Sequence, residues 1–384
     1  MSFQLDILAI HPSCVVGTNR GILRELMKRG FSVELVVPGN AEGLASNANL
    51  EPERPGDPAI HVLQPKFSIQ PSRRRTFSGL RKLIALKRPR YVWIEDEPAS
   101  LLAWQLGGLK RVYGFELICF SVENMELSLL DALRSSQSKR YVRHEVLGVL
   151  TRISRVMADK VLVCSRDGEH LMNKRGFRNA VLRTPIGYNP ELFRVDQTLR
   201  EETREALGLK DYTIAYFGRV VPEKGVEDLV AALGELKGLE WQLLLDRFAD
   251  YENPFSKVLE DAIEREGIKG RVVYFDARHD EMPRFMNAAD LVVAPSRNTP
   301  HFKEQYGRVV PEALACGCDV IVTRAGALPE LVGDEGHVVE AGNREQLVGK
   351  IRERLAKGTH PERSSRAQAL TLVEQANLLE KWLR

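Results

Sequence analysis

The sequence predicts an α/β protein with two doubly wound domains, each a parallel sheet covered by helices. Short apolar runs rich in β-branched residues alternate with longer segments of helical periodicity, and this alternation favours parallel sheets. The alternation pauses once, over residues 184–209, and then restarts. With 384 residues the chain is also long for one core, so two domains are expected.

The first domain is expected to span residues 1–188. Gly30 stands where its first helix should end. The predicted strands are residues 5–10, 32–37, 90–94, 115–120 and 160–164, and the predicted helices are residues 20–30, 99–111 and 143–158.

The second domain is expected to span residues 189–362, and a last helix, within residues 363–384, is expected to cross back to the first domain. Ligands of open α/β sheets bind beyond the carboxyl ends of the strands, so the loops at those ends are the places to look for a site. The predicted strands are residues 212–218, 240–245, 271–275, 290–296, 319–323 and 336–341, and the predicted helices are residues 225–237, 257–266, 280–289, 307–317 and 343–356.

Composition excludes several classes of protein. Apolar residues make up 43% and charged residues 28% of the chain, which is ordinary for a soluble globular protein. No apolar run approaches the ~20 residues that span a bilayer. The chain begins with a predicted strand rather than a secretory signal, and its five cysteines include no C-x-x-C pair, so buried free thiols and a cytoplasmic location are expected. The basic residues lack aromatic interleaving and any reader motif, so no nucleic-acid partner is expected.

The first candidate site follows the predicted strand 212–218. Gly218 and Arg219 end that strand, and Lys224 precedes the next helix. A helix start with an added Arg and Lys suits an anion such as a diphosphate. The alternative is a solvated turn with ordinary surface cations.

The second candidate is the segment from His301 to Gly317, which places Glu304 in a loop and Glu312 in the first turns of a helix. Backbone N–H groups at such a helix start lack partners inside the helix and are able to bind a ligand. Carboxylates accept hydrogen bonds from paired sugar hydroxyls, so two of them indicate a polyhydroxylated ligand. The alternative is a solvated loop acid and a capping acid.

The third candidate is the loop after the first strand, which contains His11 and Gly17. Gly17 precedes a helix and would suit a phosphate-approach loop, but G-x-G-x-x-G is absent and a plain turn is the alternative. His11 is either a structural histidine or a base.

No metal site is expected. The sequence contains no D-x-D and no H-E-x-x-H, and its histidines lack ligand spacing. Glu95, Asp96 and Glu97 are consecutive, but neighbours on a strand point to opposite faces.

Together these segments resemble a family 4 glycosyltransferase of the GT-B fold, over nearly the whole chain and most strongly from Thr184 to Ala341. Asn189 stands where the family usually has an aspartate in its interdomain element. The matching elements are G-R at 218–219 with E-K-G at 223–225, the stretch 294–317 with its E-x7-E, and G-A-L-P-E-L-V at 326–332. Residues 184–193 resemble the family's P-G-x-D-x-x-x-F, and residues 91–98 and 121–124 resemble parts of its acceptor domain.

The resemblance implies a retaining, metal-independent hexosyltransferase without a cofactor. Its first domain would bind the acceptor and its second the donor. It would move a hexose from a nucleotide-diphosphate sugar, UDP- or GDP-linked, to a glycan or lipid-linked acceptor in cell-surface polysaccharide synthesis. Cations and N–H dipoles would stabilise the leaving phosphate.

The same resemblance assigns roles to residues. Arg219 and Lys224 would hold the donor diphosphate, Glu304 would contact the transferred sugar and Glu312 the ribose. Arg219, Lys224 and Glu304 are therefore the catalytic candidates. The remaining donor-side residues would be Gly17, Gly218, Gln305, Tyr306, Gly307, Arg308 and Val309, and the acceptor-side residues His11, Glu123 and Asn124.

Two departures from the family pattern leave alternatives open. Gln305 follows Glu304 where many members have glycine, and Asp246-Arg247 stands where a Gly-x-Gly is common. A non-catalytic relative that binds a nucleotide sugar is one alternative. A sugar-nucleotide epimerase, or a phosphorylase, on the same fold is another.

A membrane contact is expected through residues Lys66–Arg90, which contain nine Lys/Arg and no acid. A basic amphipathic helix suits an anionic bilayer. The alternatives are that the apolar residues belong to the core, or that the cations bind an acidic glycan. The expected apolar face is Phe77, Leu80, Leu83 and Ile84, and the neighbouring cations are Arg73, Arg74, Arg75, Arg81 and Lys82.

Overall fold

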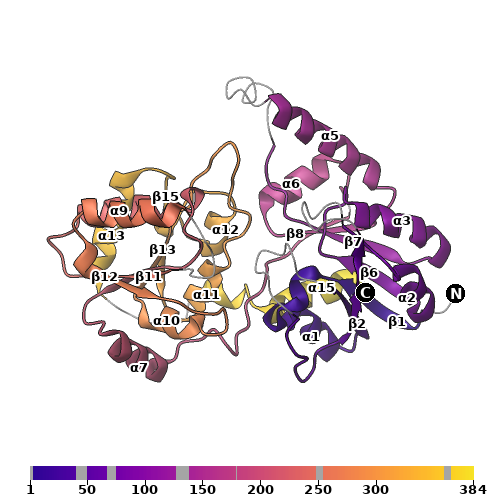
Figure 1. The fold of residues 1–384 in the computed structure, drawn as a ribbon, viewed down its shortest axis with the longest axis horizontal. Coiled ribbons are helices and arrows are strands. Elements are labelled where there is room, and N and C mark those ends of the chain that lie inside the picture. Colours follow the sequence, from indigo (N-terminus) through magenta and orange to yellow (C-terminus); the bar gives the residue numbers. More distant parts are fainter. Residues whose placement is uncertain are drawn as a thin grey trace. The chain divides into compact units, whose positions relative to one another are not determined.

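The computed structural model describes residues 3–39, 50–66, 75–126, 138–178, 180–247, 254–358 and 365–384. The chain forms two compact units, shown in Figure 1. Unit 1 comprises Met1–Pro185 together with Gln375–Arg384, and unit 2 comprises Ile186–Glu374.

Unit 1 is built on a parallel sheet of seven strands in the order β3-β2-β1-β6-β7-β8-β9. The chain builds the sheet outward from β1 on one side and then returns to add β6 on the other, so the strand order reverses between β1 and β6. The strands are β1 (Leu5–Ile10), β2 (Val33–Pro38), β3 (Ala59–Leu63), β6 (Pro89–Ile94), β7 (Glu116–Ser121), β8 (Lys160–Val163) and β9 (Val181–Arg183). A short antiparallel pair, β4 (Pro65–Lys66) and β5 (Thr76–Phe77), lies outside it.

Several helices of unit 1 bury apolar side chains against this sheet. Leu106 of α3 and Leu171 of α6 share one core with Leu8 and Ile94 of the strands. The inner strands are nearly continuous apolar runs because helices cover both faces of a parallel sheet. The helices are α1 (Gly21–Lys28), α2 (Leu80–Lys87), α3 (Leu101–Tyr113), α5 (Ser138–Ser154), α6 (Arg166–Lys174) and most of α15 (Leu372–Leu383).

The end of the chain is tied to unit 1. The Tyr91 hydroxyl donates to the Leu383 carbonyl, and Arg29 Nη2 donates to Asn377 Oδ1 at 2.8 Å. The last segment was expected to form one helix, but it forms two, α14 (Ser365–Gln368) and α15, with residues 369–371 between them.

Unit 2 repeats the architecture with six parallel strands in the order β12-β11-β10-β13-β14-β15. Here the strand order reverses between β10 and β13. The strands are β10 (Thr213–Tyr216), β11 (Gln242–Asp246), β12 (Val272–Phe275), β13 (Leu291–Ala294), β14 (Asp319–Thr323) and β15 (Val338–Val339). The helices are α7 (Gln197–Leu207), α8 (Val226–Gly234), α9 (Phe255–Arg265), α10 (Met282–Ala288), α11 (Val309–Ala315), α12 (Leu328–Val332), α13 (Arg344–Lys357) and α14.

The expected doubly wound α/β architecture is therefore confirmed in both halves. Trp241, which is fully buried, anchors the core of unit 2 and donates its Nε1–H to the Leu236 carbonyl at 2.8 Å. All five cysteines are buried free thiols, as expected.

The structure overturns the expected membrane face of α2. Phe77, Leu80, Leu83 and Ile84 all lie in the core of unit 1, where the sheet covers them. Arg75 is buried as well. Arg73 and Arg74 lie outside the described residues, so of the expected contact only exposed cations such as Arg81 and Lys82 remain. None of the helices in the described ranges is both long enough and apolar enough to span a bilayer.

Candidate functional site

The candidate residues of unit 2 gather where β10 and β13 end, which is the point of strand reversal. Gly218 and Arg219 follow β10, and Ser296 follows β13. The two loops approach closely at Gly225 (φ +68°). A Cβ at this position would lie 2.0 Å from the Pro295 carbonyl oxygen, so the close approach requires glycine. Ligands of doubly wound sheets bind at such a reversal.

Lys224 and Glu304 form the centre of this region. Lys224 ends the short 3-10 helix η4 (Pro222–Lys224), and its Nζ lies 2.6 Å from Glu304 Oε2. Ser296 Oγ donates to the same oxygen at 2.9 Å. Glu304 is buried, and the Lys224 ammonium lies 5.5 Å from the centre of the Phe302 ring. The carboxylate is therefore held by one charge and one hydroxyl in a fixed position.

A glycine after β14 fixes the loop that carries Glu304. The Ala327 amide donates to the Glu304 carbonyl at 3.1 Å. At Gly326 (φ +52°) a Cβ would lie 1.9 Å from that carbonyl oxygen, so only glycine allows the two backbones to cross. Gly326 and Ala327 are the first two residues of the G-A-L-P-E-L-V element. The role of this element is therefore to hold the loop that carries Glu304.

Glu312 has a different set of partners. It is buried in α11, its Oε1 lies 2.8 Å from His279 Nε2, and Arg308 Nε lies 3.8 Å away. The His279 ring also contacts the Phe193 ring, with centroids 5.4 Å apart. The two glutamates of the E-x7-E element thus belong to two polar clusters, one with Lys224 and one with His279.

Arg219 lies just beyond the carboxyl end of β10, and its side chain is exposed. The Tyr216 hydroxyl donates to its carbonyl at 2.7 Å and so fixes the backbone of this turn. Burial, with the Glu304 and Asp246 carboxylates nearby, raises the pKa of Tyr216, so its hydroxyl stays protonated. The backbone of Arg219 is thus held in place, while its guanidinium is exposed and accessible to a ligand.

The other donor-side candidates follow Glu304 directly. Gln305 and Arg308 are exposed and Tyr306 is buried. Gly307 (φ +87°) packs against Leu328, and a Cβ there would lie 2.4 Å from its Cδ2. Gly218 and Val309 are both half-buried.

Asp246 closes β11 with a buried carboxylate at the place where the resembled family commonly has a Gly-x-Gly. Arg247 beside it stacks on the Tyr274 ring at 4.7 Å. This end of the sheet therefore carries two bulky charged residues.

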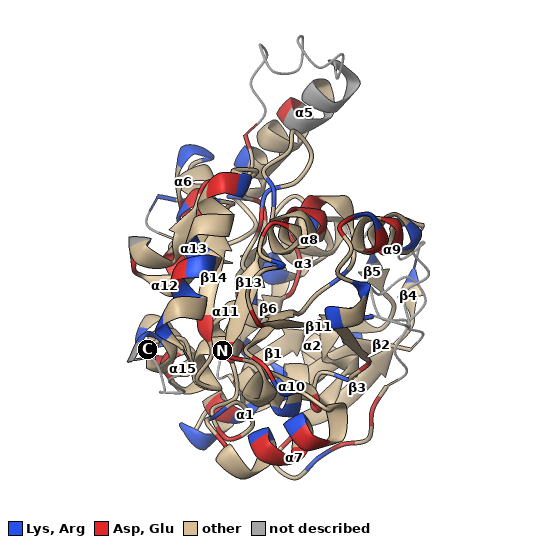
Figure 2. Cartoon of the chain, turned by 90° about the vertical axis from the view of Figure 1, so that its left-hand side faces the viewer, with Lys and Arg blue, Asp and Glu red and all other residues tan. Residues whose placement is uncertain are grey.

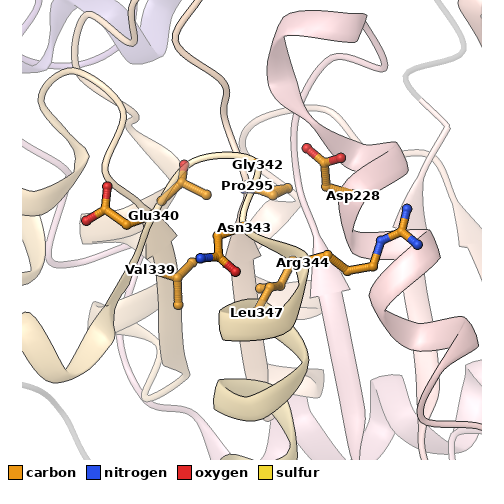
Figure 3. A pocket seen from close by; sticks show the side chains of 9 residues that line it. Asp228, Pro295, Val339, Glu340, Gly342, Asn343, Arg344 and Leu347 are labelled. Atoms are coloured by element: carbon orange, nitrogen blue, oxygen red, sulfur yellow. The ribbon is translucent and has the colours of Figure 1, made fainter.

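A small pocket also lies at the carboxyl ends of the strands of unit 2, between α8 and the start of α13, as shown in Figure 3. Asn343, one of its lining residues, caps α13 by accepting from the Gln346 amide at 3.0 Å. Asp228 is held by Arg297 through two bonds of 2.6 and 2.7 Å. Asn343 and Asp228 thus have structural partners, and the lining residues do not include Lys224, Glu304 or Glu312.

In unit 1, Gly17 begins the 3-10 helix η2 (Gly17–Arg20), and its amide is occupied. The amide donates to Glu51 Oε2 at 2.9 Å, and a Cβ would lie 2.9 Å from both that oxygen and Arg54 Nε. Arg20, fully buried, holds this loop by donating to the Cys14 and Glu51 carbonyls at 2.8 Å. The Glu51 carboxylate therefore occupies the amide of the glycine that was expected to let this loop approach the diphosphate.

His11 follows β1 and is buried with its ring edge against Trp93, with centroids 4.4 Å apart. Burial lowers the pKa of His11 to about 3, so it is neutral near pH 7. Of the other acceptor-side candidates, Glu123 forms an ion pair with Arg175, and Asn124 is buried.

The acidic run after β6 supports the backbone of unit 1. Glu95 Oε2 accepts from the Ser13 amide at 3.0 Å, and Glu97 Oε1 accepts from the Val122 amide at 2.9 Å. These carboxylates join the loops after β1, β6 and β7.

Sequence reasoning did not identify Ser296, His279 or Arg20. His279 and Arg20 have partners distant in the sequence, since Glu312 is 33 positions from His279 and Glu51 is 31 positions from Arg20, whereas Ser296 bonds Glu304 only eight positions away. Ser296 lies within the motif stretch 294–317, but nothing in the sequence indicated that its hydroxyl would bond Glu304.

Comparisons with known proteins agree with this architecture. Residues 199–369 match the family described as Glycosyl transferases group 1. The D-inositol 3-phosphate glycosyltransferase of Segniliparus rotundus is 29% identical over 177 residues, which are 45% of this chain and 38% of that protein. The chain therefore spans less than half the length of this relative.

Two further proteins resemble more of the chain. A GDP-mannose-dependent alpha-(1-6)-phosphatidylinositol monomannoside mannosyltransferase of Mycolicibacterium smegmatis is 26% identical over 314 residues, 79% of this chain and 76% of that protein. HepE of Anabaena, solved in complex with UDP, has a TM-score of 0.70 at 20% identity, covering 99% of both chains. The chain thus has the GT-B fold, and its residues 199–369 match the group 1 glycosyl transferases.

Proposed function

We propose that the protein is a retaining glycosyltransferase that moves a hexose from a nucleotide-diphosphate sugar to a glycan or lipid-linked acceptor in cell-surface polysaccharide synthesis. The observation that carries this proposal is the cluster of Lys224, Glu304 and Ser296 at the strand reversal of unit 2, inside the stretch that matches the group 1 family. Unit 2 would bind the donor and unit 1 the acceptor.

The chemistry of the cluster suits a sugar diphosphate. Lys224 and Arg219 supply full positive charge for the two phosphates, which become the leaving group. Glu304 supplies an acceptor for sugar hydroxyls, and Glu312, held by His279, supplies one for the ribose. We assign no nucleophile, and retention at the anomeric carbon remains part of the proposal.

The relatives support two donor bases. HepE is solved with UDP, and the Mycolicibacterium relative is named for GDP-mannose. That relative is also named for a phosphatidylinositol monomannoside, which favours a lipid-linked acceptor. The buried free thiols favour the reducing cytoplasm as the place of action.

The test is a thermal-shift panel with UDP-, GDP-, ADP- and TDP-sugars, followed by incubation of the best donor in water. Donor at ~100 times its dissociation constant should stabilise the protein by ~2.7 kcal/mol. Slow release of free sugar with retained configuration supports the transferase. Binding without turnover would favour the non-catalytic relative, and conversion to an epimeric nucleotide sugar would favour the epimerase.

A further inference from the structure

The outer face of α5 exposes a continuous apolar stripe. The stripe consists of five side chains that are 47–62% exposed. They are spaced by four, three, four and three residues along the helix and the turn that follows it. Such spacing places them on one helix face. A single exposed valine needs no explanation, but a contiguous stripe marks an interaction surface. The stripe consists of Val142, Val146, Val149, Ile153 and Val156.

The opposite face of α5 attaches the helix to unit 1. Thr151 and Ser154 are buried, and Ser154 Oγ accepts from Trp104 Nε1 of α3 at 3.1 Å. The inner face of the helix thus combines buried Thr151 and Ser154 with half-buried Leu147 and Leu150, while the valines point outward. Figures 1 and 2 show α5 reaching away from the sheet of unit 1.

Charge indicates what covers this stripe. Residues 138–157 contain five Lys/Arg and one acid, Glu145. Arg152 and Arg155 are exposed at the end of α5 nearest the sheet. A second copy of the chain would bring two such positive helices together, whereas an anionic surface complements them.

We propose that α5 docks unit 1 on an anionic lipid bilayer. The valine stripe lies in the boundary between headgroups and acyl chains, and Arg152 and Arg155 contact lipid phosphates. Leu101 and Trp104 of α3 are exposed beside this end of the helix, and a partly exposed tryptophan suits the same boundary. This surface is distinct from α2, whose apolar side chains lie in the core.

The test is flotation of the full chain with vesicles of phosphatidylcholine, with and without phosphatidylglycerol, at low and high salt. The wild type should float with the anionic vesicles and less so at high salt. Val146→Asp with Val149→Asp should lower partition at least ~10-fold, because two apolar side chains that would lie among the lipids are replaced by carboxylates. Arg152→Ser and Arg155→Ser should each lower it about five-fold, which is ~1 kcal/mol per cation.

Matched controls carry the same chemical change elsewhere. Val258→Asp changes an exposed valine on α9 of unit 2, and Arg81→Ser with Lys82→Ser removes exposed cations from α2. These variants should float like the wild type. Failure of the wild type to float, or equal flotation of the α5 valine variant, would overturn the proposal. So would a wild-type dimer that the α5 valine variant dissociates in vesicle-free sedimentation, since a second copy would then cover the stripe. Nucleotide affinity, measured in parallel, should not change in any of these variants.

Discussion

Lys224 Nζ lies 2.6 Å from Glu304 Oε2, although the two residues are 80 positions apart in the chain. The pair joins the loop after β10 to the loop after β13, the two strands at which the sheet order reverses. Ser296 donates to the same carboxylate oxygen. Under the proposed function, the ion pair holds the phosphate-binding cation and the sugar-binding carboxylate in place before the donor arrives, so little ordering remains to be done on binding.

Lys224→Ala and Arg219→Ala should each weaken the binding of nucleoside diphosphate at least ~10-fold. A charge-assisted hydrogen bond contributes ~1.5–3 kcal/mol, and each variant removes one cation from the proposed diphosphate site. Calorimetric titration with UDP and GDP measures the effect. Lys210→Ala, at an exposed lysine of the same unit, is the control and should bind like the wild type. Unchanged affinity in the Lys224 variant would remove it from the phosphate site.

Glu304→Gln should lower turnover far more than it lowers the affinity for free nucleotide, because Glu304 is assigned to the transferred sugar. Glu312→Ala should do the reverse, and His279→Ala should follow it, since His279 lies 2.8 Å from the Glu312 carboxylate. Steady-state kinetics and calorimetry on the three variants separate the two effects. Equal losses of nucleotide affinity in the Glu304 and Glu312 variants would show that the division between the two sugars is wrong.

Much of the fold was predictable because its inner strands have a strong signal. β1, β2, β6 and β7 are mostly apolar, with one charged residue each, as expected for strands covered on both faces. The edge strands β3 and β9 were missed. Their side chains are mostly half-buried or exposed, so their sequences lack a continuous apolar run.

The faces of two helices were not predictable from periodicity. A basic amphipathic segment such as α2 has the same pattern whether its apolar side meets a bilayer or a sheet, and the structure places Leu80 and Ile84 in the core. In α5 the helix was predicted, but its pattern did not reveal that Val146 and Val149 face outward. The choice of face is a tertiary property.

Gly326→Ala should destabilise the protein by ~3 kcal/mol or more. The residue has φ +52°, and a Cβ would lie 1.9 Å from the Glu304 carbonyl oxygen, so the loop that carries Glu304 must shift. Gly342→Ala is the matched control, because Gly342 has φ +78° with no atom within 4 Å of a built Cβ. It should cost only the backbone strain, ~1 kcal/mol. Urea unfolding measures both, and similar costs in the two variants would contradict the close crossing.

The stability of the protein should fall with decreasing pH because His11 is buried in its neutral form. Its pKa is about 3 in the folded state against 6.5 ordinarily, so between these values the unfolded chain binds a proton that the folded chain does not. The stabilisation is fully present above pH ~6.5 and is lost as the pH falls toward ~3, at up to ~1.4 kcal/mol per pH unit. His11→Phe keeps a ring against Trp93 and removes the titrating group, so its unfolding free energy should lack this part of the slope. Urea unfolding of both proteins at about pH 7, 6 and 5 measures the difference. Parallel slopes, or an NMR titration that places the His11 pKa near its ordinary value, would show that His11 is open to solvent and would return it to the acceptor-side candidates.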